Sequence, residues 1–427
     1  MNSDYTNGMG YAKNMDEQDV LRSYKSRFDI KENQIYMDGN SLGLSSIDAK
    51  EALDEAYEAW KNEGIQIWGT ENGKYFKYSQ TIAEQIAPLI HSDVDEIAVM
   101  GSITTNIHQA LSTFYKPDAS RYKIIVDELN FPTDIYAVKS IIALKGMNEE
   151  DVLVKIKSED GRTLSEDAII AAMSEEVALI LLPSVLYRSS QLIDMKRVTD
   201  AAHDKGILIG WDLAHSIGAV PHDFKSLEPD FAVWCSYKYL NGGPGATAGM
   251  YINKKHFGIS TGLKGWFGNK DSSQFAMDHN FDQDLTAGGL LQGTPNIFSM
   301  APLLGSLKPF NEAGMQALRK KSLELTGYMM FLIDERLSAY GFAIGSPRED
   351  DRRGGHVALE HDEAYRISLA MRDFGVIPDY REPNVIRLAP VPLYIGYEDT
   401  YRVIESIERI MKEKIYETYA LDRVTVL

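Results

Sequence analysis

The residues with the clearest chemical potential surround a lysine, Lys238, just after a short apolar run. Residues 231–235 have the composition of a buried strand, and a glycine-rich turn at 242–245 follows the lysine. A lysine at the carboxyl end of a strand can present its amine to a bound aldehyde. Taken alone, an exposed lysine beside a loop is the commoner case. The segment therefore needs a second signal.

That second signal is Asp212, which ends the preceding apolar run at 207–211 within the sequence WDLAHS. A carboxylate here could keep a pyridinium nitrogen protonated and so turn the ring into an electron sink. Considered in isolation, a helix N-cap is an equally good interpretation. Because Asp212 and Lys238 follow consecutive strand-like runs, the pair favours a pyridoxal 5'-phosphate (PLP) site.

Two further segments fit the same cofactor. Ser102, Ile103 and Thr104 follow a strand-like run and open a helix, where free backbone N–H groups can hold a phosphate. By itself this pattern is more often plain N-capping. Phe131 follows the next run, in the sequence FPTD, and could place an aromatic face on a planar ring.

The elements that must position these residues alternate along the chain. Strand-like runs occur at 96–100, 123–126, 152–156, 177–185, 207–211, 231–235 and 249–252, and helical patterns lie between them at 107–115, 134–144, 165–173 and 195–205. This alternation predicts an α/β fold with a mostly parallel sheet covered on both faces. In such sheets ligands bind at the carboxyl ends of the strands, where the candidate residues fall.

The chain divides into three predicted parts. Residues 1–33 are polar without clear periodicity, and we expect a loose N-terminal arm. Residues 34–313 form the large domain, whose first segment also contributes to a small domain. A long helical pattern at 314–340 then leads into the small α+β domain, which completes residues 314–427.

Composition excludes several classes of function. The 44 Lys and Arg residues against 62 Asp and Glu give a net charge of −18 and no long basic run, which argues against binding to nucleic acid or an anionic membrane. The single cysteine, Cys235, excludes an internal disulfide and a multi-thiolate zinc site. Nine histidines without metal-ligand spacing predict no metal. With neither a signal-peptide pattern nor a membrane-spanning run, we expect a cytoplasmic protein.

Seven sequence blocks together resemble the kynureninase family. They are YMDGNSLGL at 36–44, FPTD at 131–134, WDLAHSIGAVP at 211–221, CSYKYLNGGPG at 235–245, GWFG at 265–268, QGTPNI at 292–297 and IRLAPVPLY at 386–394. The resemblance runs in order from about residue 34 to about residue 410. It implies PLP fold type I, related to the class V enzymes, with a three-layer large domain and a small α+β C-terminal domain.

The resemblance also implies an activity. The family hydrolyses L-kynurenine or 3-hydroxykynurenine to anthranilate or 3-hydroxyanthranilate and L-alanine, in tryptophan catabolism and on a route to NAD biosynthesis. It implies a homodimer with shared active sites. The alternatives are a related enzyme for another β-acyl alanine, a class V aminotransferase, or a lyase such as a cysteine desulfurase, which would need a mobile catalytic cysteine.

Residue by residue, the resemblance implies a complete site. Lys238 would hold the cofactor as a Schiff base, Tyr237 would relay protons, and Asp212 would pair with the ring nitrogen. Arg387 would bind the substrate α-carboxylate, a task suited to its planar fork. The remaining cofactor contacts would come from Ile103, Thr104, Phe131, Pro132, Thr133, Asp134 and His215, and, across the dimer interface, from Trp266 and Thr294.

Three patterns stand apart from this assignment. Arg188 occupies a position where many relatives carry a tyrosine that bonds the phosphate, so it could serve the same anion or point into solvent. Residues 39–43, GNSLG, match the nucleophile motif of serine hydrolases, but only one short run precedes Ser41, and that context is wrong. The loop GGPGATAG at 242–249 leads into a strand and not a helix, so it does not support NAD binding.

Overall fold

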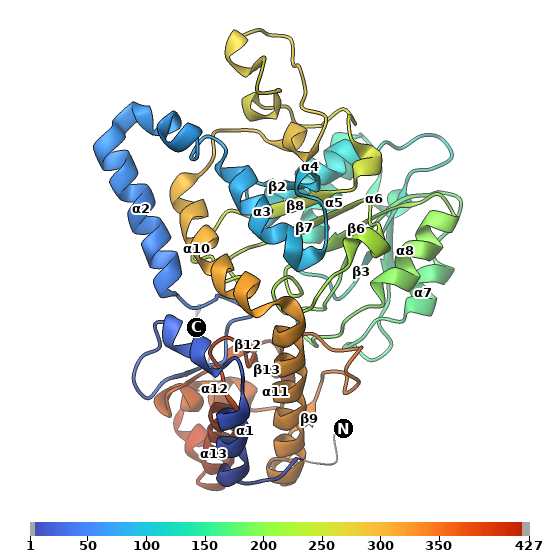
Figure 1. Cartoon of the computed structure of the whole chain (residues 1–427). Helices are drawn as coiled ribbons and strands as arrows, with labels where there is room; N and C mark the ends of the chain where they lie inside the picture. The colour runs from blue at the N-terminus through green and yellow to red at the C-terminus, as the bar shows by residue number, and fades with distance from the viewer. Residues whose placement is uncertain (1–4, 421–427) are drawn as a thin grey trace.

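The computed structural model describes residues 5–420 and is built around a large sheet (Figure 1). Within these residues the sheet has seven strands in the order β2-β8-β7-β6-β5-β3-β4. All seven predicted runs form its strands, and β8 runs in the direction opposite to the other six. The strands are β2 (Ile97–Val99), β3 (Lys123–Asp127), β4 (Leu153–Ile156), β5 (Val177–Pro183), β6 (Leu208–Asp212), β7 (Phe231–Trp234) and β8 (Gly249–Ile252).

Alternate residues of the strands enter two separate cores. Ile125 and Ile180 pack in one core, whereas their neighbours Val126 and Leu181 pack in the other. Because successive strand side chains point to opposite faces, both faces of the sheet are covered. The large domain therefore has the predicted three layers, helix, sheet and helix (Figure 1).

The helical patterns at 107–115, 134–144, 165–173 and 195–205 coincide with helices of the large domain, whereas the helices at 78–90 and 297–313 were not predicted. In the first helix, Ser46 caps the start by accepting from the amide of Ala49, and Gly64 follows the last residue. The helices are α2 (Ile47–Glu63), α3 (Tyr78–Ile90), α4 (Ile103–Phe114), α5 (Pro132–Leu144), α6 (Glu149–Val152), α7 (Glu166–Ala171), α8 (Met195–Asp204), α9 (Phe224–Leu227) and α10 (Ile297–Ala313).

The long helix α11 (Met315–Arg336) leads from the large domain to the small one (Figure 1). The small domain contains a sheet of order β12-β13-β10-β9. Its elements are β9 (Ala343–Ile344), β10 (Val357–Glu360), α12 (Ala364–Asp373), β11 (Val376–Ile377), β12 (Asp379–Arg381), β13 (Val385–Leu388) and α13 (Tyr397–Lys412). The early strand β1 (Ile35–Tyr36) pairs with β11, so the segment after the arm joins the small domain. Because α11 begins directly after Gly314 and leads into the small domain, we propose residue 314 as the boundary between the two domains.

The N-terminal arm differs from the loose segment that we expected. Residues Met9–Gln18 form helix α1, which packs beside α13. Ala12 is fully buried there, and the ring of Tyr11 lies 5.5 Å from that of Tyr328. Asp16 accepts from the amides of Tyr397 and Glu398 and so caps α13. Apolar residues in α1 are too few to show a pattern, and contacts with the small domain determine its structure.

No helix within the described residues is long and apolar enough to span a membrane.

Candidate active site

Lys238 and Asp212 lie on the wall of one cleft at the carboxyl ends of β6 and β7. The cleft is narrow, with a cavity volume of about 30 Å³. Its lining contains eight of the predicted site residues, namely Ile103, Phe131, Thr133, Asp134, Asp212, His215, Tyr237 and Lys238. Thr104 is joined to this group through a hydrogen bond of 2.8 Å between its hydroxyl and that of Thr133. Pro132 is the first residue of α5.

The two buried carboxyl groups in the cleft, Asp134 and Asp212, are electrostatically coupled. Burial raises the pKa of Asp212, and the positive charge of Lys238 opposes that rise. Burial, followed by the charge of Asp212, raises the pKa of Asp134 well above its ordinary value. Asp134 therefore keeps a proton more readily than Asp212. Asp212 carries the negative charge and accepts from the amide of Ala214 at 2.7 Å.

His215 positions the lysine amine. Its Nε2 lies 2.9 Å from Lys238 Nζ. Burial, and then the charge of Lys238, lower the pKa of His215 well below its usual range, so the ring is neutral. A neutral imidazole can accept a hydrogen bond from the lysine and holds the amine inside the cleft.

An aromatic ring and a helix start complete the cleft. The Phe131 ring is 43% exposed, and its centroid lies 5.9 Å from Lys238 Nζ, which leaves one face open to a planar ligand. Helix α4 begins at Ile103 after Gly101, whose φ is +55°. A side chain at Gly101 would place its Cβ 2.4 Å from Thr105 Oγ1, so only glycine fits this turn. The amide of Thr105 donates to Ser102 Oγ, which leaves those of Ile103 and Thr104 available to an anion.

Arg387 lies beside the cleft in a network of its own. Its side chain is 1% exposed and donates to Tyr187 O at 2.7 Å, to Ser41 Oγ at 2.9 Å and to Asp379 Oδ2. Tyr187 lines the cleft, and its ring meets that of Phe131 edge to face at 5.6 Å. Arg387 is therefore held next to the cleft by its hydrogen bond to Tyr187, a residue that lines the cleft.

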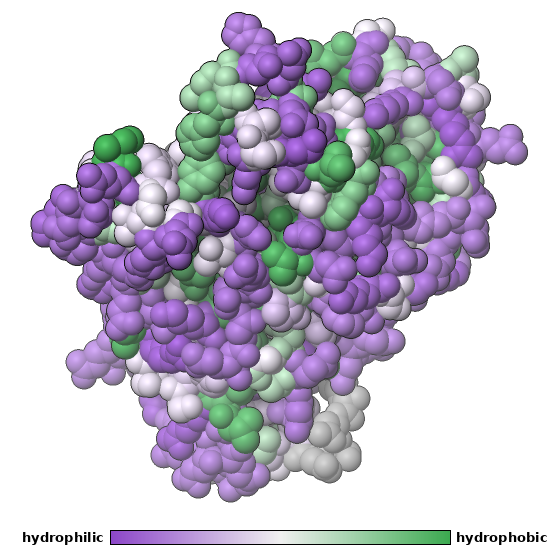
Figure 2. All heavy atoms as spheres, turned by 45° about the horizontal axis from the view of Figure 1, so that its top comes forward, coloured by the Kyte–Doolittle hydropathy of each residue, from purple (hydrophilic) through white to green (hydrophobic). Residues whose placement is uncertain are grey.

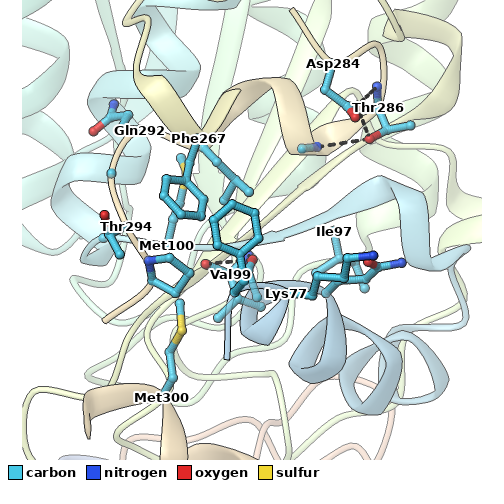
Figure 3. A pocket seen from close by; sticks show the side chains of 18 of the residues that line it. Lys77, Ile97, Val99, Met100, Phe267, Asp284, Thr286, Gln292, Thr294 and Met300 are labelled. Atoms are coloured by element: carbon cyan, nitrogen blue, oxygen red, sulfur yellow. Dashed lines mark hydrogen bonds between the residues drawn. The ribbon is translucent and has the colours of Figure 1, made fainter. Parts of the chain in front are cut away.

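Trp266 and Thr294 lie away from the Lys238 cleft of their own subunit. Thr294 lines a different pocket of about 430 Å³, together with Phe267, Met100 and Met300 (Figure 3). Trp266 is 39% exposed, and its Nε1 donates to Gln274 O. In a single subunit neither side chain lines the cleft of Lys238.

Sequence reasoning missed several residues of the site. Asn130 and Tyr187 line the cleft, and the side chain of Asn130 is buried without a hydrogen bond. Asn130 directly precedes the FPTD motif, and Tyr187 directly precedes Arg188. Their positions next to these residues could have identified them. Arg188 does not line the cleft; its Nη2 donates to Asn384 Oδ1 at 3.0 Å. Arg188 therefore bonds Asn384 and does not reach into the cleft where it could have bound the cofactor phosphate.

The residues present fit PLP. The cofactor's aldehyde requires an amine, which Lys238 supplies, and its ring nitrogen requires an anion, which Asp212 supplies. Nδ1 of His215 is buried in the cleft without a hydrogen bond, as expected of a group arranged around a polar ligand. No group of three or more metal-ligating side chains comes together within residues 5–420.

Comparison with solved structures gives the class of the fold. A cysteine desulfurase from Thermococcus onnurineus NA1 matches with a TM-score of 0.78 at 16% identity, over 92% of this chain and 98% of that one. The C-DES protein, in a structure with glycine covalently linked to the PLP cofactor, matches with a TM-score of 0.77 at 15% identity, over 90% and 98%. Fold and site together define a PLP enzyme of fold type I.

Sequence relatives give the family. A kynureninase from Geobacillus thermodenitrificans is 50% identical, and one from Bacillus anthracis is 51% identical, each over 97% of both chains. Residues 318–407 also match the family described as kynureninase C-terminal domain. The chain belongs to the kynureninase family, and the predicted resemblance, fold class and cofactor are confirmed.

Proposed function

We propose that this chain hydrolyses L-kynurenine, 3-hydroxykynurenine or both to the corresponding anthranilate and L-alanine. The observation that carries the proposal is the meeting of Lys238 and Asp212 in one cleft beside Phe131. Full-length similarity to kynureninases gives the substrate class. A place in tryptophan catabolism and NAD biosynthesis follows from this reaction, and a cytoplasmic location agrees with the single, reduced cysteine.

The reaction breaks the bond between the β and γ carbons of the substrate. When bound, PLP supplies the electron sink that this cleavage needs. Asp212 would pair with the ring nitrogen and favour its protonated form, because its carboxylate is buried and little screened by water. Arg387 binds the α-carboxylate, and Phe131 keeps the planar system in place. Together these contacts orient the bond that breaks.

Proton transfers fall to Lys238 and Tyr237. The Lys238 amine could remove the α proton of the substrate, and His215 keeps that amine within the cleft. Burial raises the pKa of Tyr237, so its hydroxyl stays protonated and can donate. The carboxylic acid product takes its oxygen from water added at the γ carbonyl. Each positioned acid or base contributes about 10²- to 10⁴-fold.

The functional unit that we propose is a homodimer. Trp266 and Thr294 do not line the Lys238 cleft of their own subunit, and the family resemblance assigns them to the partner's site. Large aromatic side chains are also exposed: Trp60 at 53%, Phe298 at 45% and Phe275 at 62%. Hydrophobic groups lie open between hydrophilic ones on the face shown in Figure 2. Exposed apolar surface of this kind is typical of subunit interfaces.

The direct test is to incubate the PLP-loaded protein with L-kynurenine and measure anthranilate fluorescence and L-alanine together. The proposal predicts both products in equal amounts. Alanine formed from another β-acyl alanine but not from kynurenine would support the related alternative. Amino-acid formation from an added 2-oxo acid would indicate an aminotransferase.

A cysteine desulfurase is not favoured, although the solved structures above share its fold. That activity needs an accessible cysteine, and Cys235 is 2% exposed at the end of β7.

A further inference from the structure

Two arginines of the small domain, Arg381 and Arg387, bond the same two groups. Asp379 Oδ2 accepts from the Nε atoms of both. Ser41 Oγ lies 2.9 Å from Nη2 of Arg387 and 3.5 Å from Nη2 of Arg381. In the pairing of β12 with β13, Asp379 faces Arg387 and Arg381 faces Val385, so both guanidiniums are on one side of the sheet.

The two arginines differ in how many of their N–H groups are engaged. Arg387 is 1% exposed and already has three hydrogen bonds, one from each nitrogen. The Arg381 side chain is 36% exposed, its contact with Ser41 is long, and its Nη1 has no hydrogen bond within the described chain. Arg381 can therefore still donate N–H groups to a carboxylate that approaches from solvent.

The charges around the pair also allow an anion to bind. Asp379 is the one carboxylate that hydrogen-bonds these two guanidiniums within residues 5–420. Asp38 also interacts with both arginines, and burial, followed by the charge of Asp379, raises its pKa to about 6. A substrate carboxylate can bridge the two guanidinium forks through their remaining N–H donors.

The pair is also close to the cleft. Ser41 belongs to the loop whose Gly43 donates to Tyr237 O at 2.7 Å, directly before Lys238. Arg387 donates to the carbonyl of Tyr187, a residue of the cleft wall. An amino acid with its amine at Lys238 would extend its α-carboxylate toward this side.

We propose that Arg381 is a second specificity-determining residue for the α-carboxylate of the substrate and binds it together with Arg387. The inference rests on the proposed function in one respect, that the substrate is an amino acid. Ser41 and Asp379 contact both guanidiniums and so keep them beside each other.

The test compares two ligands that differ only in the carboxylate, L-alanine and ethylamine. Each is titrated into the PLP-loaded protein, and binding is followed by the absorbance of the cofactor. For Arg381→Gln we expect affinity for L-alanine to fall about tenfold or more, with ethylamine affinity nearly unchanged. Arg381→Lys keeps the positive charge but lacks the planar guanidinium fork. Its affinity for L-alanine should lie between that of Arg381→Gln and that of the native protein. Arg402→Gln, which removes a surface pair with Glu398, is the matched control and should change neither affinity.

Equal losses for both ligands, or unchanged affinity for L-alanine in both Arg381 variants, would overturn the proposal. Because the assay uses no kynurenine, it is independent of the main proposal. A protein that binds L-alanine through Arg381 yet forms no anthranilate would contradict the proposed reaction and retain this carboxylate site.

Discussion

At the scale of single residues, environment separates the roles of chemically similar groups. Asp134 and Asp212 are both buried carboxyls, yet the charge of Asp212 favours protonation of Asp134, and Lys238 favours ionisation of Asp212. The sequence marked both residues by their motifs. The sequence could not show which of the two carboxyl groups is protonated. Their electrostatic interaction depends on the distance between them, which is set by the folded structure.

The variant Asp212→Asn tests the role of this charge. Asparagine is neutral and cannot hold a positive charge on the ring nitrogen, so we expect kcat to fall about 10²- to 10³-fold while Lys238 still binds the cofactor. Cofactor content and kcat should be measured on the same preparation. The exposed Asp278→Asn provides a control of equal charge change. A kcat within a few-fold of the native value would remove Asp212 from the catalytic group.

His356 predicts how stability depends on pH. Burial, followed by the positive charge of Arg387, lowers its pKa to about 3. The unfolded chain therefore binds one more proton than the folded chain below the ordinary histidine pKa, and stability is lost as pH falls. This residue alone should account for about 2 kcal/mol of the free energy of unfolding between pH 7 and pH 5.

Urea unfolding of His356→Gln at several pH values measures that contribution. The native protein should lose more stability than the variant over this range, whereas the exposed His279→Gln should follow the native protein. Parallel pH curves for the native protein and His356→Gln would show that His356 does not titrate as its burial requires.

At the scale of elements, the buried strands were predictable and the loop contacts were not. Every strand of the large sheet appears as an apolar run, since burial on both faces demands it. Helix α1 escaped prediction because its partner α13 lies almost 400 residues away in sequence. The loop containing Ser41 matched a hydrolase motif. In the structure this loop packs against the residues next to Lys238, because Gly43 donates to Tyr237 O.

Gly43→Ala tests that packing. An added Cβ would lie 2.4 Å from Lys238 O and 2.3 Å from Asn241 Oδ1, so the loop or the lysine turn must move. Overpacking of this kind costs about 1–3 kcal/mol, and we expect a lower melting temperature together with weaker cofactor retention. Gly10→Ala in helix α1, whose added Cβ meets nothing within 4 Å, should lower neither the melting temperature nor cofactor retention. Full cofactor content and native stability in Gly43→Ala would refute the contact.

At the scale of the whole molecule, one chain places its candidate cofactor residues in two separate pockets. Lys238 lines one cleft, and Thr294 lines another pocket. The motifs marked both groups of residues. Their separation within one chain was not evident from order along the sequence, and the homodimer that we propose would bring the two groups together.

Hybrid dimers test the shared site. One subunit would carry Lys238→Ala, and the other Trp266→Ala with Thr294→Ala. The hybrid restores one native site of two, so the purified hybrid should show about half of the native turnover, although each parent dimer is nearly inactive. Turnover equal to the mean of the two parents would mean that each subunit forms its site alone.

The most direct measurement concerns Lys238 itself. The PLP-loaded protein is reduced with borohydride, which fixes the cofactor to its amine, and digested for peptide mapping by mass spectrometry. We predict phosphopyridoxyl label on Lys238, within the segment Tyr237–Gly245, and none in Lys238→Ala. Label on another lysine of the native protein, or unchanged labelling of the variant, would contradict the assignment on which the active site rests.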